Sequence, residues 1–503
     1  MKIAVLVLYA LMMVVVIVFT ARKSISLNEF LLGGRNVGPW MSAFSYGTAY
    51  FSAVIVVGYA GSIGWRVGFS ALWVGIGNAL LGGLLAWSLL AKPTRQMGER
   101  LGVATVPSFL EKRYQSKMLK VISSLIIFIF LLPYSASVYK GIGIMFQKAM
   151  GFDYTWCVIG IAVLSSAYLF LGGYRATAVS DFIQGIIMLL GIFAVVFYIL
   201  RGAGGVSAGL VELGKEAVGG QGFNTLLPPK GEGIFLLSNI VLTSLGVLGM
   251  PHMIHKFFAI KETAAIRRAT VISSLFCLII AGGAYFAGSF GRVIFSKLGT
   301  TPAAPDQIMP TILVDQSVVG MPDAFLGLVV VLLLSASIST LTALVLSSSS
   351  ILSIDLLGVF FPKMEAKRTT LIMRLLCVAF VLFSLMVNFL MQGTPIISLM
   401  SLSWGTIAGA FLAPFLYGLL WKGVTKAGAY AGIVCGALTS LLPPLVTGNF
   451  SLAPISGACA MGVGLILVPL VSILTKKWRF SDEHLDMVFG KKTKAAKTSS
   501  TAV

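Results

Sequence analysis

Long apolar segments alternate with short polar stretches along almost the whole sequence. An α-helix needs about 20 mostly apolar residues to cross the hydrocarbon core of a bilayer. Segments of roughly that length lie at residues 2–20, 40–62, 67–91, 119–147, 154–172, 178–200, 234–255, 268–292, 323–352, 371–391, 395–421, 427–446 and 453–475. The pattern therefore predicts an all-α polytopic membrane protein with about 13 transmembrane helices. No small-residue cleavage site follows the first segment, so we interpret it as a helix and not as a signal peptide.

Composition supports this fold class. The 503 residues are 57% hydrophobic and 11% charged, whereas soluble domains carry about 25% charged residues. We expect one transmembrane domain at 1–475 and a polar, cytoplasmic, disordered tail at 476–503. The five Cys lie singly in apolar segments, and the three His form no metal-ligand set, so no transition-metal site is predicted.

The distribution of positive charge indicates which loops lie on the cytoplasmic side of the membrane. With the N-terminus outside, most of the 37 Lys and Arg residues fall in the loops of one side or in the tail, and the bias alternates from loop to loop. Cytoplasmic loops of membrane proteins carry such an excess. We therefore expect a multi-pass plasma-membrane protein with a cytoplasmic C-terminus, and we do not read the net charge of +20 as a nucleic-acid-binding surface.

One apolar segment is unusually rich in hydroxyl groups. In residues 332–346, Ala336, Ser339 and Thr340 stand at i, i+3 and i+4, so a helix places them on one face. Oxygen ligands suit a small hard cation, and a small side chain leaves a backbone carbonyl accessible. The alternative is that these hydroxyls bond to carbonyls of the preceding turn or join helices together.

Two of the predicted helices have breaks at matching places. Segment 40–62 has a polar middle and several glycines, and segment 234–255 contains Gly246, Gly249 and Pro251. They begin two runs of five helices, and because five is odd the second run is inverted in the membrane. Broken helices in inverted repeats mark a solute and ion site at the midplane. The alternative is that Gly and Pro are simply common in membrane helices.

Four stretches resemble the sodium:solute symporter family: GGRNVGPW (33–40), LGGYRATAVSDFIQGIIML (171–189), GMPHMIHKFFA (249–259) and SASISTLTALVLSSSSILSIDLL (335–357). The resemblance runs from about residue 30 to about residue 440. It implies a leucine-transporter-type core of five plus five inverted helices, with repeats at about 40–200 and 234–421. It also implies symport of a solute with Na⁺ by alternating access, with Na⁺ as coupling ion, no other cofactor and no enzymatic activity.

The resemblance also implies site residues. The sodium ligands would be carbonyls of Thr48, Phe51 and Ala336 and hydroxyls of Ser339 and Thr340. Asp181 and Gln184 would act in inner gating or ion exit. For Asp181, the alternative is an acid that is stabilised by the dipole at a helix start.

The solute is less defined by the sequence. Proline symporters of the family carry an Asp where this chain has Tyr50, and aromatic residues where it has Thr243 and Val247. The pattern around 244–252 is closer to pantothenate symporters. We expect a small carboxylate, such as pantothenate or a monocarboxylate. A proton-coupled or sodium-independent transporter and a proline or amino-acid symporter are the alternatives.

Lys140 adds to the carboxylate hypothesis. It lies well inside a predicted helix that also carries Tyr134 and Tyr139, which we count with it as candidate solute ligands. A lysine at the bilayer centre costs about 2.5–3.5 kcal/mol unless it faces water or a partner. Its ammonium would therefore either snorkel to the outer headgroups or face the solute cavity.

Other functional classes are disfavoured. An enzyme would need a nucleophile–base set or a cofactor motif, and neither is visible. A channel would need a continuous polar pore lining, which makes it the least favoured reading. The expected partners are the solute, Na⁺ and the lipid bilayer, without nucleic acid or an obligatory protein partner.

Overall fold

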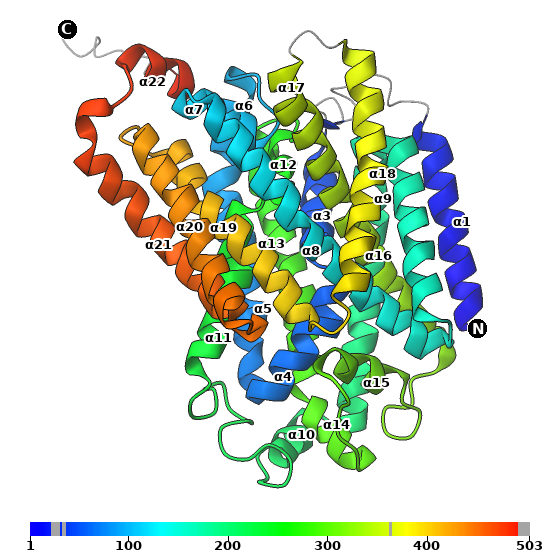
Figure 1. The fold of residues 1–503 in the computed structure, drawn as a ribbon. Helices are drawn as coiled ribbons and strands as arrows, with labels where there is room; N and C mark the ends of the chain where they lie inside the picture. The colour runs from blue at the N-terminus through cyan, green and yellow to red at the C-terminus, as the bar shows by residue number, and fades with distance from the viewer. Residues whose placement is uncertain (22–30, 33–36, 362–364, 491–503) are drawn as a thin grey trace, which may run out of the picture.

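The computed structural model describes residues 1–21, 31–32, 37–361 and 365–490, with side chains outside 17–21, 168–176 and 366–367. These residues form a helical bundle whose N-terminal face, with residue 1, α10 and α14, is the lower one in Figure 1. The C-terminal face, with α6, α7 and α22, is the upper one. Motif residues 33–36 and the side chains of 171–176 lie outside the described residues.

The first half of the chain holds α1 (Lys2–Ala21) and the elements of the first predicted run. These are α3 (Pro39–Tyr50), η2 (Val54–Ala60), α4 (Gly61–Val67), η3 (Gly68–Ala71), α5 (Leu72–Gly77), η4 (Asn78–Leu85), η5 (Trp87–Ala91), α6 (Lys92–Arg100), α7 (Val106–Tyr114), α8 (Lys117–Met150), α9 (Tyr154–Ala203) and α10 (Val206–Leu213). The fifth and sixth predicted helices both fall within α9, whose apolar parts are Tyr154–Ala167 and Thr177–Ala203.

The second half contains α11 (Gly233–Ile240), η6 (Val241–Leu245), η7 (Gly246–Gly249), α12 (Pro251–Phe258), α13 (Ala264–Ser289), α14 (Gly291–Leu298), η8 (Pro305–Gln307), α15 (Ile308–Val314), α16 (Asp323–Ser350), η9 (Ile351–Leu356), α17 (Leu357–Phe360), α18 (Ala366–Leu390) and α19 (Ile396–Leu420). The chain ends with α20 (Lys426–Thr447), η10 (Phe450–Leu452), α21 (Ala453–Leu474), η11 (Lys476–Trp478) and α22 (Asp482–Phe489). Among the described residues, nine helices are long and apolar enough to cross a membrane, or ten with one bent pair.

Both predicted breaks are present. After α3, Phe51 is extended (φ −112°, ψ 132°), and helical structure resumes at Val54 in η2. After η7, Met250 is extended (φ −83°, ψ 118°), and α12 leaves at 44° to the preceding helix. Pro251 suits the start of α12 because a first helical residue needs no donor. A Cβ on Gly249 would lie 2.9 Å from Cα of Ala408, so the break is packed against α19.

The helices differ in how far they are enclosed. Nearly every residue of α16 and α19 is buried, whereas α18, α20 and α21 keep much of their apolar surface exposed. In Figure 1, α16 lies within the bundle while α1 and α21 lie at opposite edges. The hydroxyl-rich face of α16 therefore points into protein, where its polar groups need partners.

The tail differs from the expectation of disorder. Within the described residues, α22 packs on the C-terminal face, where His484 Nε2 lies 3.1 Å from the carbonyl oxygen of Arg113. Arg113, which the charge pattern placed in an inside loop, is fully buried. Its guanidinium donates to the Gly418 carbonyl at 3.0 Å and lies 5.3 Å from the Phe489 ring. Local polarity alone does not reveal such a docking partner far along the chain.

The contact between α19 and α20 yields a stability prediction. A Cβ on Gly436 would lie 2.0 Å from the Gly409 carbonyl oxygen, so Gly436→Ala forces the helices apart. Overpacking typically costs about 1–3 kcal/mol. Thermal unfolding of the purified protein should shift down for Gly436→Ala and stay unchanged for Gly462→Ala, which has nothing within 4 Å. Equal unfolding temperatures for the two variants would contradict this packing.

Candidate functional site

The unwound end of α3 faces the middle of α16. The Thr340 hydroxyl lies 3.0 Å from the Ala336 carbonyl oxygen, 3.4 Å from that of Thr48 and 3.3 Å from that of Phe51. The last carbonyls of a helix have no partner within it, and here they face a hydroxyl instead. The Ala49 carbonyl, 3.3 Å from the same hydroxyl, was not predicted from the sequence. We call this group of oxygen atoms, with Ser339, the ion cluster.

A carboxylate touches the ion cluster. The Ser339 hydroxyl lies 2.7 Å from Asp181 Oδ1 and 2.9 Å from Thr48 Oγ1. Asp181 projects from α9 and is 1% exposed. The predicted sodium ligands and Asp181 thus come together from three separate helices.

Lys256 compensates the charge of Asp181. Its ammonium lies 3.5 Å from Asp181 Oδ2 and 2.7 Å from Ser45 Oγ, and Ser45 Oγ lies 2.5 Å from the same carboxylate oxygen. The charge pattern placed Lys256 in an inside loop, but it is 4% exposed. Its position directly after the second helix break was the available signal. The pair joins α12, α3 and α9 on the C-terminal side of the ion cluster.

Gln184 lies one helical turn after Asp181 on α9. Its Nε2 donates to the Tyr9 hydroxyl on α1 at 3.0 Å and approaches Met13 Sδ at 3.5 Å. The same Tyr9 hydroxyl also interacts with Ser335 and Asp181. The expected role of Gln184 in gating or ion exit stays a prediction.

A small cavity lies beside the ion cluster. Its volume is about 20 Å³, and it is lined by Tyr50, Phe51, Ser52, Val54, Ile55, Tyr59, Asn78, Thr243, Tyr285, Met400 and Trp404. The Tyr50 and Trp404 rings stack with centroids 6.0 Å apart. Because Phe51 belongs to both the cavity and the ion cluster, one unwound stretch serves both. We call this the central cavity.

Asn78 organises the polar part of the central cavity. Its Oδ1 accepts from the Thr243 hydroxyl at 3.0 Å and from the Ser244 hydroxyl at 2.9 Å. The Tyr50 hydroxyl lies 3.2 Å from the same oxygen and 2.6 Å from the Thr243 carbonyl oxygen. The structure thus brings the predicted residues Tyr50 and Thr243 together. The sequence analysis did not include Asn78 among the site residues, although an amide inside an apolar segment indicates a polar partner within the protein.

Two hydrogen-bond donors line the central cavity. Nε1 of Trp404 interacts with the Tyr134 hydroxyl, and the Tyr285 hydroxyl interacts with Asn78. An indole N–H can only donate, and a phenol O–H can also donate. A solute that supplies acceptor oxygens could therefore bind to both groups.

Other predicted solute ligands do not line this cavity. Tyr134 packs edge-on against Trp404, with ring centroids 5.8 Å apart, and so lies behind the cavity wall. The Tyr139 hydroxyl faces Ser165 Oγ at 3.4 Å. Val247 is buried in η7.

The structure contradicts both predicted positions of the Lys140 ammonium. Its ammonium neither snorkels nor lines the central cavity, but lies 2.9 Å from Asp306 Oδ2 and 2.7 Å from the Thr394 carbonyl oxygen. Asp306 also accepts the N–H of Ile396 at 3.1 Å and so satisfies a donor at the start of α19. The partner carboxylate comes from η8, and no pattern in the sequence linked it to Lys140.

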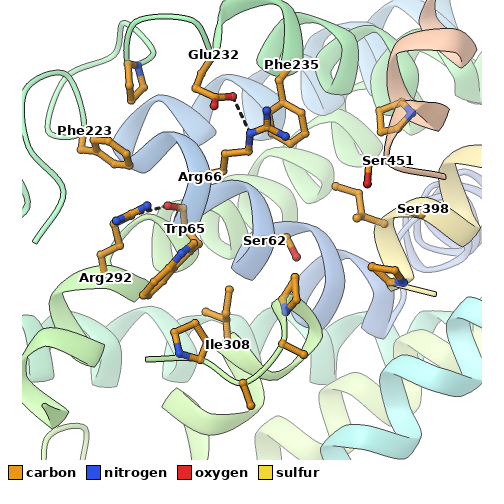
Figure 2. Close-up of a pocket in the computed structure, with 18 of the residues that line it drawn as sticks. Ser62, Trp65, Arg66, Phe223, Glu232, Phe235, Arg292, Ile308, Ser398 and Ser451 are labelled. Carbon is orange, nitrogen blue, oxygen red and sulfur yellow. Dashed lines mark hydrogen bonds and ion pairs between the residues drawn. The ribbon is translucent and has the colours of Figure 1, made fainter. Parts of the chain in front are cut away.

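A larger pocket opens on the N-terminal face. Its volume is about 670 Å³, and Figure 2 shows its lining. Tyr59 stands between it and the central cavity, because Tyr59 lines that cavity while its hydroxyl lies 2.8 Å from Ser401 Oγ and 3.4 Å from the carbonyl oxygen of Ile397. Ile397 lines the larger pocket, which we call the vestibule.

Comparison with known proteins adds three similarities. The chain is 30% identical over 465 residues to the high-affinity proline transporter PutP of Bacillus subtilis, covering 91% of this chain and 95% of the relative. A solved Na⁺-coupled sialic acid symporter in a substrate-bound outward-open state matches with a TM-score of 0.77 and 16% identity, over 93% of this chain and 97% of the other. Mhp1, a nucleobase-cation-symport-1 family transporter, matches with a TM-score of 0.56 and 16% identity, over 93% and 98%.

These similarities establish the fold and the general activity. The fold is the leucine-transporter type, with at least nine membrane-spanning helices among the described residues, and the protein is a sodium-coupled solute symporter rather than an enzyme. The leaning toward pantothenate symporters finds no support among the relatives, which are proline transporters. The family model that matches residues 30–436 is that of the sodium:solute symporters, and the chain belongs to the sodium:solute symporter family.

Proposed function

We propose that Na⁺ binds in the ion cluster, between the unwound end of α3 and the middle of α16. The carbonyls of Thr48, Phe51 and Ala336 and the hydroxyls of Ser339 and Thr340 are the oxygen ligands that a hard cation prefers. Their support is geometric, since the Thr340 hydroxyl already lies within 3.4 Å of all three carbonyl oxygens. An Na⁺ ion at this place would be coordinated by backbone carbonyls that have no hydrogen-bond partner within a helix.

Asp181 is proposed as the first group that the ion meets on leaving. It touches Ser339 and lies between the ion cluster and the C-terminal face, so a cation can move from hydroxyl to carboxylate without crossing an apolar layer. Lys256 would then control the charge at this step. Its ammonium, 3.5 Å from Asp181, compensates the carboxylate while no ion is there and repels an ion that arrives.

The N-terminal face is proposed as the outside of the plasma membrane. The C-terminal face carries the basic residues Lys92, Arg100, Lys112 and Lys117 on α6 to α8, as cytoplasmic segments do. The vestibule then opens outward, and the ion leaves past Asp181 to the cytoplasm. Uptake driven by the inward sodium gradient follows from this orientation.

The solute is proposed to be a small carboxylate. The donors of Trp404 and Tyr285 at the cavity wall support this proposal, because a carboxylate offers acceptors to both. The central cavity, at about 20 Å³, has room for about one water molecule, so it must widen before any of these solutes can enter. The relatives named as proline transporters make proline-like amino acids the first candidates.

The ion site makes the first prediction. Ser339→Ala or Thr340→Ala should raise the sodium concentration for half-maximal uptake at least several-fold, because each removes one oxygen ligand. Ser350→Ala is the matched control, since this buried serine on the same helix bonds to the Ser347 carbonyl at 2.8 Å. Uptake into proteoliposomes over a range of sodium concentrations measures the effect. Normal sodium activation of uptake in both site variants would show that Na⁺ binds elsewhere in the protein.

The ion pair makes the second prediction. Lys256→Met or Asp181→Asn alone deprives a buried charge of its partner, which typically costs about 3–5 kcal/mol, whereas the double variant removes both charges. The double variant should therefore unfold at a higher temperature than at least one single variant, as measured on purified protein. Strictly additive destabilisation would show that the two side chains are not coupled.

The solute site makes the third prediction. Trp404→Phe keeps the ring stacked on Tyr50 but removes the indole N–H, so KM for the transported carboxylate should rise about tenfold, equivalent to about 1.4 kcal/mol. Trp87→Phe is the control, because its Nε1 is also buried but does not line the cavity. Sodium-driven uptake of proline, propionate and pantothenate identifies the solute. Equal KM for the two variants would exclude Trp404 as a ligand.

A further inference from the structure

The last described helix, α22, is too short to be stable by itself. It has eight residues, whereas isolated helices shorter than about 12–15 residues are marginal in water. Its structure therefore depends on what it packs against. Leu485 and Val488 are 1% and 0% exposed and form its buried face, while Met487 on another face is 54% exposed. A helix that is held by so few apolar side chains can detach from the protein and return at a small cost in free energy.

One end of this packing is the contact of α22 with α7, beside which it lies in Figure 1. His484 Nε2 lies 3.1 Å from the Arg113 carbonyl oxygen and therefore donates to it, while Nδ1 accepts from the Gln115 side-chain amide at 3.0 Å. Gln115 has a φ of 48°, which residues other than glycine adopt rarely and where contacts hold them. Both ring nitrogens of His484 are thus used to hold α22 on the end of α7.

The helix α7 is in turn fixed to the end of α19. The Arg113 guanidinium donates to the carbonyls of Gly418 at 3.0 Å and Trp421 at 3.1 Å. Directly after α19, the Lys422 ammonium lies 3.7 Å from the Asp486 carboxylate of α22. The three helices α22, α7 and α19 therefore form one connected unit at the C-terminal face.

The helix α6 is connected to a different part of the protein. Arg95 Nε donates at 2.6 Å to the carbonyl of Ile260, which follows α12. A Cβ on Gly98 would lie 2.4 Å from the Phe258 ring, so α6 packs closely on the end of α12. The helix α12 carries Lys256, which lies on the C-terminal side of the ion cluster. The helices α6 and α12 therefore form a second unit, next to the ion route.

The end of α22 joins the second unit to the first. Arg100, the last residue of α6, donates from Nη1 to the carbonyl oxygen of Phe489, the last residue of α22, at 2.5 Å. This hydrogen bond is exposed to solvent, whereas the bond between His484 and Arg113 is buried. An exposed hydrogen bond is readily replaced by bonds to water. The contact with α6 is therefore the one that breaks first when the two units separate.

We propose that α22 is a strap across the cytoplasmic face, which stays on α7 and α19 and holds α6 through Arg100. This rests on the proposed function in that the C-terminal face is taken as the cytoplasmic end of the ion route. Opening of this face moves α12 with Lys256, and α6 must follow α12. Because Phe489 holds Arg100, the strap slows this step, and the inner face opens after the bond between them breaks.

The test measures backbone hydrogen–deuterium exchange of the full-length protein in nanodiscs, in sodium-free buffer without solute. Arg100→Met removes the donor, so the amides of α6 and α12 should exchange about fivefold faster, as the loss of one exposed hydrogen bond allows. Lys92→Met is the matched control, since Lys92 is an exposed basic residue on the same helix. Unchanged exchange of α12 in Arg100→Met, or an equal rise in α20, overturns the proposal.

A second pair of variants acts on the whole strap. Leu485→Asp places a charge on the buried face of α22, so α22 should detach and the amides of α6 and α12 should exchange at least about tenfold faster. Met487→Asp adds the same charge on an exposed face and should leave the exchange of both helices unchanged. Fast exchange of α22 in Leu485→Asp without faster exchange of α12 would show that α22 only covers the surface, and the proposal would be wrong.

A cross-link tests the opposite change. Arg100→Cys combined with Phe489→Cys, joined by a flexible bis-methanethiosulfonate reagent, should slow the exchange of α12 about fivefold relative to the same protein after reduction. Each single variant, treated with the same reagent, accounts for reaction at the five native cysteines. Equal exchange in the cross-linked and the reduced protein would show that α6 does not part from α22, which contradicts the strap.

These measurements separate the strap from the proposed function. They need neither Na⁺ nor a solute, so their outcome does not depend on which solute is carried. The proposed function fails in a different assay, when a sodium gradient drives no carboxylate uptake into proteoliposomes of the wild-type protein.

Discussion

The bundle depends on a short stretch of backbone that is not helical inside a membrane. Between α3 and η2, Phe51 and Ser52 leave the last carbonyls of α3 without helical partners. In lipid, every such group must find a partner in the protein. The Thr340 hydroxyl provides one, and α16 must therefore lie against the break along its hydroxyl-rich face. The burial of α16 is a consequence of this requirement.

Two buried ion pairs stand on either side of this break. Lys256 and Asp181 join α12 to α9 on the C-terminal side, and Lys140 and Asp306 join α8 to η8 on the N-terminal side. Buried pairs contribute little net stability but are costly to break by losing one partner. Their value lies in fixing which helices approach each other. A transporter that opens alternately on its two faces needs such contacts at each end, because each opening must separate a defined set of helices.

The sequence predicts local features well and partnerships poorly. Helix breaks at Gly249–Pro251 and around Phe51 follow from residue type, and the common face of Ala336, Ser339 and Thr340 follows from helical spacing. By contrast, Lys140 was assigned to water or solute because its partner Asp306 lies in a distant short turn. Arg113 was assigned to a loop because α22, which covers it, lies far along the chain, although Ser481 followed by two acidic residues is a helix-start signal. Charge alone cannot show burial when the compensating group is remote in sequence.

In the proposed function, the position of Phe51 couples the ion site to the solute site. Its carbonyl faces the ion cluster, while the residue itself lines the central cavity. An ion that pulls this carbonyl into its coordination shell fixes the backbone that shapes the cavity, and a solute that fills the cavity fixes the carbonyl for the ion. Coupling between two sites is reciprocal, so each ligand raises the affinity for the other by the same factor. Asn78 extends this link to the second broken helix, because its side chain accepts from Thr243 and Ser244 beside the other break. In the proposed function, both halves of the bundle therefore contact the same pair of ligands, which is the condition for moving ion and solute together across the membrane.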